Sequence, residues 1–498
     1  MSTDDLTIAL TFAAYLALML GIGLYAWRRT ANLADFVLGG RRLGSWVAAL
    51  SASASDMSGW LLLGLPGYAY ASGLESLWLA AGLLAGTWLN WRLMAARLRV
   101  YSELAGNALT LPEFFARRFR DDSGLLRVIA AVFILLFFLF YTSAGLVAGG
   151  KLFESVFGLP YVWAVATGVA AIILYTSVGG FLAVSWTDLV QGLLMAAALV
   201  AVPLMAFDKI GGPSPAFDAI EGINPALLEL FTDKGGTALG TVAIISLLAW
   251  GLGYFGQPHI LARFQAVRSV RDIPRARHIA VIWVFLTLTG ATLTGLAGIA
   301  LLDPPLSGGD AEKVFIHLVD LLFHPVIAGI CLAAILAAVM STADSQLLVA
   351  SSAFTEDFYR ALLRRDAGEK ELVLTGRLAV LSVALAAFVL ALDRDSKVLD
   401  LVAYAWAGFG AAFGPALLLS LYWKRMTRTG ALAGIIVGGL TVVVWKQMGG
   451  GLFDLYEIVP GLLLSTAAIV ATSLADQPPS EEVRAEFDQV RRRLETSP

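Results

Sequence analysis

Thirteen apolar segments run through this chain, and most of them are long enough to cross a lipid bilayer. Each helical crossing takes about 20 mostly apolar residues. Hydrophobic residues make up 58% of the 498 residues and charged residues only 15%, a balance far from that of an ordinary soluble domain. The sequence therefore predicts an all-α polytopic membrane protein. The segments lie at roughly 6–27, 45–71, 75–96, 124–150, 161–183, 187–207, 238–262, 278–302, 318–353, 372–392, 397–423, 429–448 and 455–475.

The basic residues predict the orientation of these segments. Roughly four in five of the 35 lysines and arginines fall in alternate loops or at segment ends on one side. Cytoplasmic loops carry such an excess, so we expect the N-terminus outside and the C-terminus in the cytoplasm. A single transmembrane domain, 1–475, is then followed by a short cytoplasmic tail, 476–498. The net charge of −3 argues against a nucleic-acid partner, and the single Cys331 excludes an intrachain disulfide.

Two polar clusters interrupt the apolar segments, one at residues 51–60 and one at 340–346. Each contains an acid, Asp56 in the first and Asp344 in the second. A carboxylate at membrane depth is costly and marks an ion or substrate pathway by default. No lysine or arginine lies in the middle of a segment, so we expect this pathway to carry a cation. Close helix packing through small residues explains the serines of the first cluster equally well, but it does not explain Asp56.

The two clusters are predicted to meet at one depth. At 1.5 Å per residue, Ala54 and Met57 lie roughly 14–18 Å from the inner end of their segment, and Ser341 and Thr342 roughly 17–18 Å from theirs. Hard cations such as sodium take oxygen ligands. Backbone carbonyls near Ala54, Met57 and Ala338, together with the Ser341 and Thr342 hydroxyls, suit such an ion.

A third irregular stretch, Trp250 to Pro258, contains three glycines and a proline. Its glycines match the spacing of a dinucleotide-binding loop, but a membrane segment is the wrong context for one. We expect a broken helix instead. Trp250 and Tyr254 share a face at i, i+4. Together with Tyr141 they could enclose a small apolar ring, or they could be packing or interfacial residues.

Further polar residues also stand out in the apolar segments and near their ends. Ser341, Asp344 and Ser345 share one helix face, which places a carboxylate beside the hydroxyls. Asp188 follows Ser185-Trp186-Thr187 and is either the cap of a helix N-terminus or a step on the exit route of an ion. Arg41 is either a topology signal or part of an inner gate.

Five motifs resemble those of the sodium:solute symporter family, and the resemblance covers nearly the whole chain. It implies a core of two inverted five-helix repeats, here segments 2–6 and 7–11, with a broken helix leading each repeat. The motifs are Ser53 to Leu62, Gly179 to Asp188, Trp250 to His259, Ala337 to Thr342 and Tyr404 to Gly410.

The resemblance also implies roles for individual residues. Asp56 is implied to support sodium coupling, Asp188 and Arg41 to act in ion release and inner gating, and Asp344 with Ser345 to form a possible second cation step. The implied sodium site is Ala54, Met57, Ala338, Ser341 and Thr342. The implied solute site is Ser58, Gly59, Trp60, Tyr141, Trp250 and Tyr254.

The function implied is sodium-driven uptake of L-proline across a bacterial inner membrane, with sodium as a co-transported ion rather than a prosthetic group. The first alternative is a transporter with the same fold and sodium coupling that carries another small solute, such as another amino acid, an osmolyte, pantothenate or a sugar. A sensor acting with a separate partner and an ion channel are further alternatives, although no obligate protein partner is evident. An enzyme is least expected, because the four histidines are scattered and no nucleophile–base pair is recognisable.

Overall fold

A computed structural model describes residues 3–27, 38–176, 180–364 and 366–496. Within these ranges the chain forms helices and connections, and its only β pairings are the isolated bridges Leu43–Val267 and Thr232–Ala238. The predicted all-α architecture is therefore confirmed. Gly179, the first residue of one of the five motifs, lies outside the described residues.

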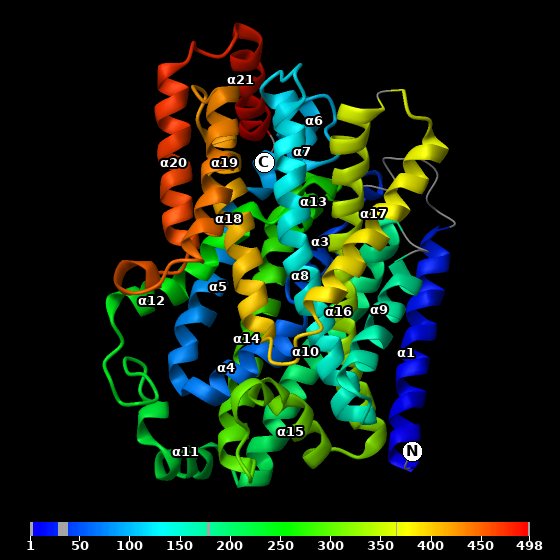
Figure 1. Cartoon of the computed structure of the whole chain (residues 1–498), viewed down its shortest axis with the longest axis vertical. Coiled ribbons are helices and arrows are strands. Elements are labelled where there is room, and N and C mark those ends of the chain that lie inside the picture. Colours follow the sequence, from blue (N-terminus) through cyan, green and yellow to red (C-terminus); the bar gives the residue numbers. More distant parts are fainter. Residues whose placement is uncertain (1–2, 28–37, 177–179, 365, 497–498) are drawn as a thin grey trace.

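Most helices run side by side along the long axis of the molecule (Figure 1). In the described part of the chain, eight of them are long and apolar enough to cross a membrane. The α-helices are α1 (Thr3–Trp27), α3 (Ser45–Asp56), α4 (Leu65–Ser72), α5 (Ser76–Leu93), α6 (Ala95–Leu104), α7 (Leu111–Arg118), α8 (Leu125–Phe157), α9 (Tyr161–Thr176), α10 (Phe181–Ile210), α11 (Pro213–Ile223), α12 (Thr241–Leu248), α13 (Pro258–Ala266), α14 (Ile273–Leu301), α15 (Val314–Leu322), α16 (Pro325–Ser352), α17 (Glu369–Leu390), α18 (Val398–Tyr422), α19 (Arg428–Trp445), α20 (Ile458–Ala475) and α21 (Glu481–Glu495).

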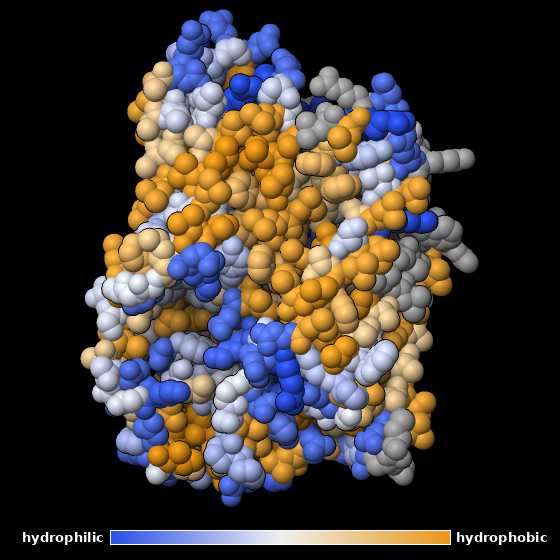
Figure 2. Space-filling view, viewed as in Figure 1, coloured by the Kyte–Doolittle hydropathy of each residue, from blue (hydrophilic) through white to orange (hydrophobic). Residues whose placement is uncertain are grey.

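Burial separates central helices from peripheral ones. In the most apolar part of Pro325–Arg360, a range that contains α16, 83% of the residues are buried. In the most apolar part of α1, only 28% of the residues are buried. An apolar helix with little internal contact offers its side chains to lipid. Figure 2 shows apolar side chains over a broad band of one face, with hydrophilic side chains gathered toward the two ends.

Both predicted broken helices are present. The first consists of α3, an irregular turn at Met57 and Ser58, a π-helical stretch Trp60–Gly64, and α4. The second consists of α12, a 3₁₀ stretch Ala249–Gly256, and α13, which begins at Pro258. Proline has no N–H and so cannot continue a preceding helix.

The ninth predicted segment is also divided. Helix α15 ends at Leu322, and α16 begins at Pro325 after His324 in extended conformation. The chain thus bends near His324 and Pro325. Helix α16 then runs unbroken through the second polar cluster.

The C-terminal tail forms α21, which packs against α6 instead of standing free in solvent. Its apolar residues Val483, Phe487 and Val490 are buried, and the Phe487 ring lies 6.4 Å from that of Tyr101 on α6. Helices α6, α7 and α21 lie at the same end of the molecule, the upper end in Figure 1, whereas α1 begins at the other.

Candidate functional site

The two polar clusters meet where α3 breaks. The Ser341 hydroxyl donates to the Ala54 carbonyl at 2.8 Å and lies 3.1 Å from the Ala338 carbonyl. The Thr342 hydroxyl lies 3.5 Å from the Ala54 carbonyl. All four residues are buried. The depth prediction is confirmed, because groups far apart in sequence form one oxygen-rich cluster.

The break in α3 makes the Ala54 carbonyl available. In a continuous helix the N–H of Ser58 would donate to Ala54, but here it donates to the Asp56 carbonyl at 3.0 Å. Likewise the N–H of Leu61 donates to the Ser58 carbonyl at 3.0 Å in place of the carbonyl of Met57. The Met57 side chain points elsewhere, with its sulfur 3.9 Å from the Thr287 hydroxyl.

Aromatic side chains gather around Asp56. Its backbone carbonyl accepts a hydrogen bond from the Tyr141 hydroxyl at 2.7 Å and one from the Trp60 indole N–H at 3.3 Å. Its carboxylate accepts one from the Tyr254 hydroxyl at 2.8 Å. The Trp60 and Trp250 ring centroids lie 6.4 Å apart. The predicted aromatic residues are thus brought together from α8 and from both broken helices.

Ser58 and Gly59 lie in the same irregular turn. The Ser58 hydroxyl oxygen lies 3.5 Å from the N–H of Trp60. A side chain at Gly59 would place its Cβ only 2.4 Å from the Cβ of Ala148 on α8. Glycine is therefore needed here for the broken helix to approach α8.

A buried arginine overturns one interpretation of the sequence. Arg263 on α13 is fully buried, and its guanidinium lies 3.1 Å from the Asp188 carboxylate. It also donates to the Ser345 hydroxyl at 2.6 Å and to the Ser51 hydroxyl at 3.0 Å. The conclusion that this pathway holds no fixed cation is wrong. Arg263 stands at the end of an apolar segment, but α13 packs it against α3, α10 and α16.

Asp188 is not the cap of a helix. Helix α10 begins at Phe181, so Asp188 lies well inside it, where the Ser51 hydroxyl donates to its carboxylate at 2.6 Å. The polar residues before Asp188 suggested a later helix start, but Ser185 and Thr187 donate to carbonyls within the helix. Asp344 is fully buried on α16 next to Ser345.

Arg41 joins segments at the end of the molecule that carries α6, α7 and α21. Its guanidinium donates to the Gln265 carbonyl at 2.7 Å, the Ala108 carbonyl at 3.0 Å and the Asn107 side chain at 3.0 Å. Beside it, the N–H of Leu43 donates to the Ala266 carbonyl at 3.1 Å. These bonds tie the segment ahead of α3 to the end of α13.

The opposite end is also tied together. Lys151 on α8 is buried and lies 2.6 Å from the Glu312 carboxylate. That carboxylate also accepts a hydrogen bond from the N–H of Val398, the first residue of α18, at 3.0 Å. The aromatic and oxygen-rich groups therefore lie between two ends at which such contacts join separate helices and connections.

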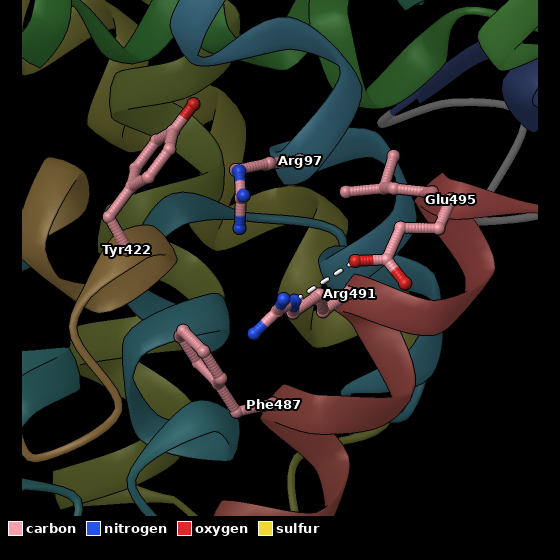
Figure 3. A pocket seen from close by; sticks show the side chains of 6 residues that line it. Arg97, Tyr422, Phe487, Arg491 and Glu495 are labelled. Atoms are coloured by element: carbon pink, nitrogen blue, oxygen red, sulfur yellow. Dashed lines mark hydrogen bonds and ion pairs between the residues drawn. The ribbon is translucent and has the colours of Figure 1, made fainter.

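A cavity of about 490 Å³ lies outside this region, between α6, the end of α18 and α21. Figure 3 shows its lining, with Arg97 and Arg491 beside the rings of Tyr422 and Phe487. None of the predicted site residues lines it.

The sequence interpretation missed three residues that contact the predicted site. Arg263 looked like a topology signal, and Trp406 lay in a recognised motif to which no role was given. Tyr456, which stacks on Trp250 with ring centroids 5.6 Å apart, carried no signal in the sequence.

Comparison with known proteins identifies the family. A sequence model of the Sodium:solute symporter family matches residues 36–438. This chain belongs to that family. As a member, it is a sodium-coupled solute transporter rather than an enzyme.

The chain is 53% identical to the "Sodium/proline symporter" of Escherichia coli (strain K12), over 96% of this chain and 95% of the relative. It is 52% identical to the "High-affinity proline transporter PutP" of Bacillus subtilis (strain 168), over 94% and 98%. It is 50% identical to the "Osmoregulated proline transporter OpuE" of the same organism, over 96% of each chain.

Solved structures of other symporters share the fold. A substrate-bound, outward-open Na⁺-coupled sialic acid symporter superposes with a TM-score of 0.78 at 21% identity, covering 95% of this chain and 99% of that one. Mhp1, a nucleobase-cation-symport-1 family transporter in a closed conformation, gives 0.56 at 13% identity, covering 93% and 100%.

Proposed function

We propose that this protein is a secondary active symporter that couples inward sodium flow to the uptake of L-proline across a bacterial inner membrane. The observation that carries the proposal is the oxygen cluster at the broken helix, where the freed Ala54 carbonyl faces the Ser341 and Thr342 hydroxyls. The three curated relatives described above are named as proline transporters.

The architecture proposed is that of thirteen membrane crossings, with an outer N-terminus and a cytoplasmic C-terminus. Segments 2–6 and 7–11 form two inverted repeats. Each begins with a broken helix, α3–α4 in the first and α12–α13 in the second. Discontinuous helices of this kind supply carbonyls and helix ends to transported ions and solutes.

Sodium binds to the carbonyls of Ala54, Met57 and Ala338 and to the hydroxyls of Ser341 and Thr342. Four of these groups already lie within hydrogen-bond distance of at least one other. Each hydroxyl can turn its lone pairs toward a cation that displaces its present hydrogen bond. Sodium binding then orders the turn at Met57 and Ser58, which connects ion binding to the neighbouring solute site.

Proline binds beside that turn. Its ring lies among Trp60, Tyr141, Trp250 and Tyr254, and its carboxylate faces the irregular backbone at Ser58 and Gly59. Asp56 supports coupling from the same turn, because Tyr141 and Tyr254 both donate to it. A shift of either helix half therefore moves groups of the ion site and of the solute site together.

Ion release and inner gating involve Asp188 and Arg41. The Arg263 guanidinium already occupies the cation position beside Asp188 and Ser345, which favours a gating pair over a second sodium step that also uses Asp344. Opening of the inner side requires the bonds from Arg41 to the Gln265 and Ala108 carbonyls to break.

The test is uptake of labelled L-proline into proteoliposomes that contain the purified protein. An inward sodium gradient should drive accumulation, and the reversal potential should give the number of sodium ions per proline. Uptake that persists without a sodium or lithium gradient would contradict the proposal. Competition by other amino acids, osmolytes, pantothenate and sugars decides whether proline is the preferred solute.

A further inference from the structure

Tyr456 touches the solute site from outside the two proposed repeats. It lies in the connection between α19 and α20, and its ring stacks on that of Trp250 at 5.6 Å with 24° between the planes. Its hydroxyl donates to the Ala403 carbonyl on α18 at 2.6 Å. Its N–H donates to the Ser246 hydroxyl on α12 at 2.9 Å. Tyr456 is therefore held both at its backbone and at its hydroxyl.

Trp406 holds the backbone of Trp250. Its indole N–H donates to the Trp250 carbonyl at 2.7 Å, and its ring meets that of Tyr254 edge-on at 4.9 Å. The indole fits because residue 253 is glycine, where a Cβ would lie 1.9 Å from the Trp406 indole nitrogen. Trp406 is itself buried.

Three residues thus contact Trp250. Its indole lies beside the rings of Tyr456 and Trp60, and its carbonyl accepts a hydrogen bond from Trp406. A large side chain that is free to change rotamer costs conformational entropy when a ligand orders it. Neighbours that hold the side chain in place remove that cost and fix the width of the site.

We infer that Tyr456 and Trp406 are positioning residues that hold Trp250 and thereby set the ring-size selectivity of the solute site. The inference rests on the proposed binding of proline. A fixed Trp250 gives the solute site a single width, which under the proposed function is the width that proline, with its five-membered ring, requires. With its support removed, Trp250 can move away and admit a six-membered ring, as in pipecolic acid.

The experiment uses the full-length protein in proteoliposomes with a sodium gradient. KM and kcat are measured for L-proline and for pipecolic acid in Tyr456→Ala, Tyr456→Phe and Trp406→Phe. One methylene in an apolar pocket changes kcat/KM roughly 10–200-fold. A loss of selectivity for proline over pipecolic acid is therefore large enough to measure. We expect Tyr456→Ala and Trp406→Phe to raise KM for proline roughly tenfold and to reduce discrimination against pipecolic acid by a similar factor. Tyr456→Phe keeps the stacked ring and should retain most of the selectivity.

Trp78→Phe is the matched control. Trp78 lies near the start of α5, its indole N–H donates to the Leu230 carbonyl at 2.9 Å, and its ring packs on that of Phe231 with the centroids 5.4 Å apart. Its selectivity should equal that of the wild type. If Tyr456→Ala does not assemble in the membrane, Tyr456→Leu keeps apolar bulk without the ring and takes its place.

Two results would overturn the inference: a fall in kcat alone with unchanged selectivity in the Tyr456 and Trp406 variants, or an equal loss of selectivity in Trp78→Phe. Failure of the wild type to carry proline is a different result, since it rejects the proposed function before any variant is compared.

Discussion

Arg263 shows at the scale of one residue how a charge is tolerated inside this protein. Its guanidinium is fully buried and donates hydrogen bonds to four acceptors through its Nε and Nη atoms, and it lies 4.9 Å above the ring of Phe181. Burying an ion costs several kcal/mol unless a partner of opposite charge and hydrogen bonds compensate it. Asp188, Ser51 and Ser345 supply that compensation, so Arg263 connects α13 to three other helices.

Arg263→Gln should destabilise the protein strongly, because it leaves the Asp188 carboxylate buried without its countercharge. Breaking a buried pair from one side costs about 3–5 kcal/mol. The double variant Arg263→Gln with Asp188→Asn removes both charges and should recover much of that loss. Thermal unfolding of the purified variants measures both. Arg268→Gln is the control, since its pair with Asp272 is largely exposed on the arginine side and should be worth less than about 1 kcal/mol. Equal losses in the single and double variants would contradict a compensated pair.

Ser341→Ala should weaken sodium activation of transport. The hydroxyl is the group closest to the Ala54 carbonyl, and loss of one ligand worth about 1.4 kcal/mol raises the half-saturating sodium concentration roughly tenfold. Ser352→Ala is the control on the same helix, because its hydroxyl donates only to the Leu348 carbonyl within α16. Sodium dependence of proline uptake in the two variants is compared with the wild type. Equal sodium dependence in all three would show that Ser341 is not a ligand.

At the scale of helices, the breaks were predictable and their neighbours were not. Pro258 and the small or polar residues near Asp56 signal local loss of regular helix, and both breaks are where the sequence placed them. What lies opposite a break depends on residues far away in the chain. The motif Tyr404 to Gly410 was recognisable, yet nothing local indicated that Trp406 bonds to the Trp250 carbonyl.

Gly253→Ala tests how tightly the second broken helix packs on α18. The new Cβ would lie 1.9 Å from the Trp406 indole nitrogen and 2.3 Å from its Cδ1, so one of the two elements must move. Overpacking of this kind costs about 1–3 kcal/mol. We expect a lower thermal stability and less protein in the membrane, measured by unfolding in detergent and by quantitative blotting.

Gly23→Ala provides the comparison for that variant. Its Cβ would meet no atom within 4 Å, and alanine is favoured over glycine in a helix by roughly 0.5–1 kcal/mol. Its stability should be equal to or above that of the wild type. A Gly253→Ala protein as stable as Gly23→Ala would mean that the contact with Trp406 relaxes freely.

At the scale of the whole molecule, the sequence predicted an all-helical membrane transporter because apolar length and family motifs are properties of the chain itself. The docking of α21 could not be predicted in the same way. Its buried residues Val483, Phe487 and Val490 form a visible apolar stripe, but the surface that covers them is α6, nearly 400 residues earlier in the chain. Pairing of two amphipathic surfaces is decided by the tertiary fold.

A series of ion pairs and hydrogen bonds connects α21 to the end of the molecule at which Arg41 joins several segments. Arg493 on α21 lies 2.8 Å from Glu103 on α6, and Glu103 also binds Arg99 at 2.5 Å. Arg99 in turn donates to the Val267 carbonyl at 2.6 Å, next to the bridge between Leu43 and Val267. Partial burial alone would raise the pKa of Glu103, but its hydrogen bonds with Arg99 and Arg493 lower it below the ordinary 4.5.

Arg493→Gln should therefore loosen α21 and reduce the pH dependence of its docking. Because the pKa of Glu103 is lowered in the folded state, the stabilisation is complete above about pH 4.5 and is lost as pH falls through the lowered value. A partly exposed pair is worth about 0.2–1 kcal/mol, so amide hydrogen exchange in α21 should be up to about fivefold faster in the variant at neutral pH. Arg491→Gln removes the same charge from the same helix, but its partner Glu495 also lies on α21, so docking should be unchanged. Equal exchange in the two variants would show that the contact with Glu103 does not hold the helix, and that the apolar stripe alone does.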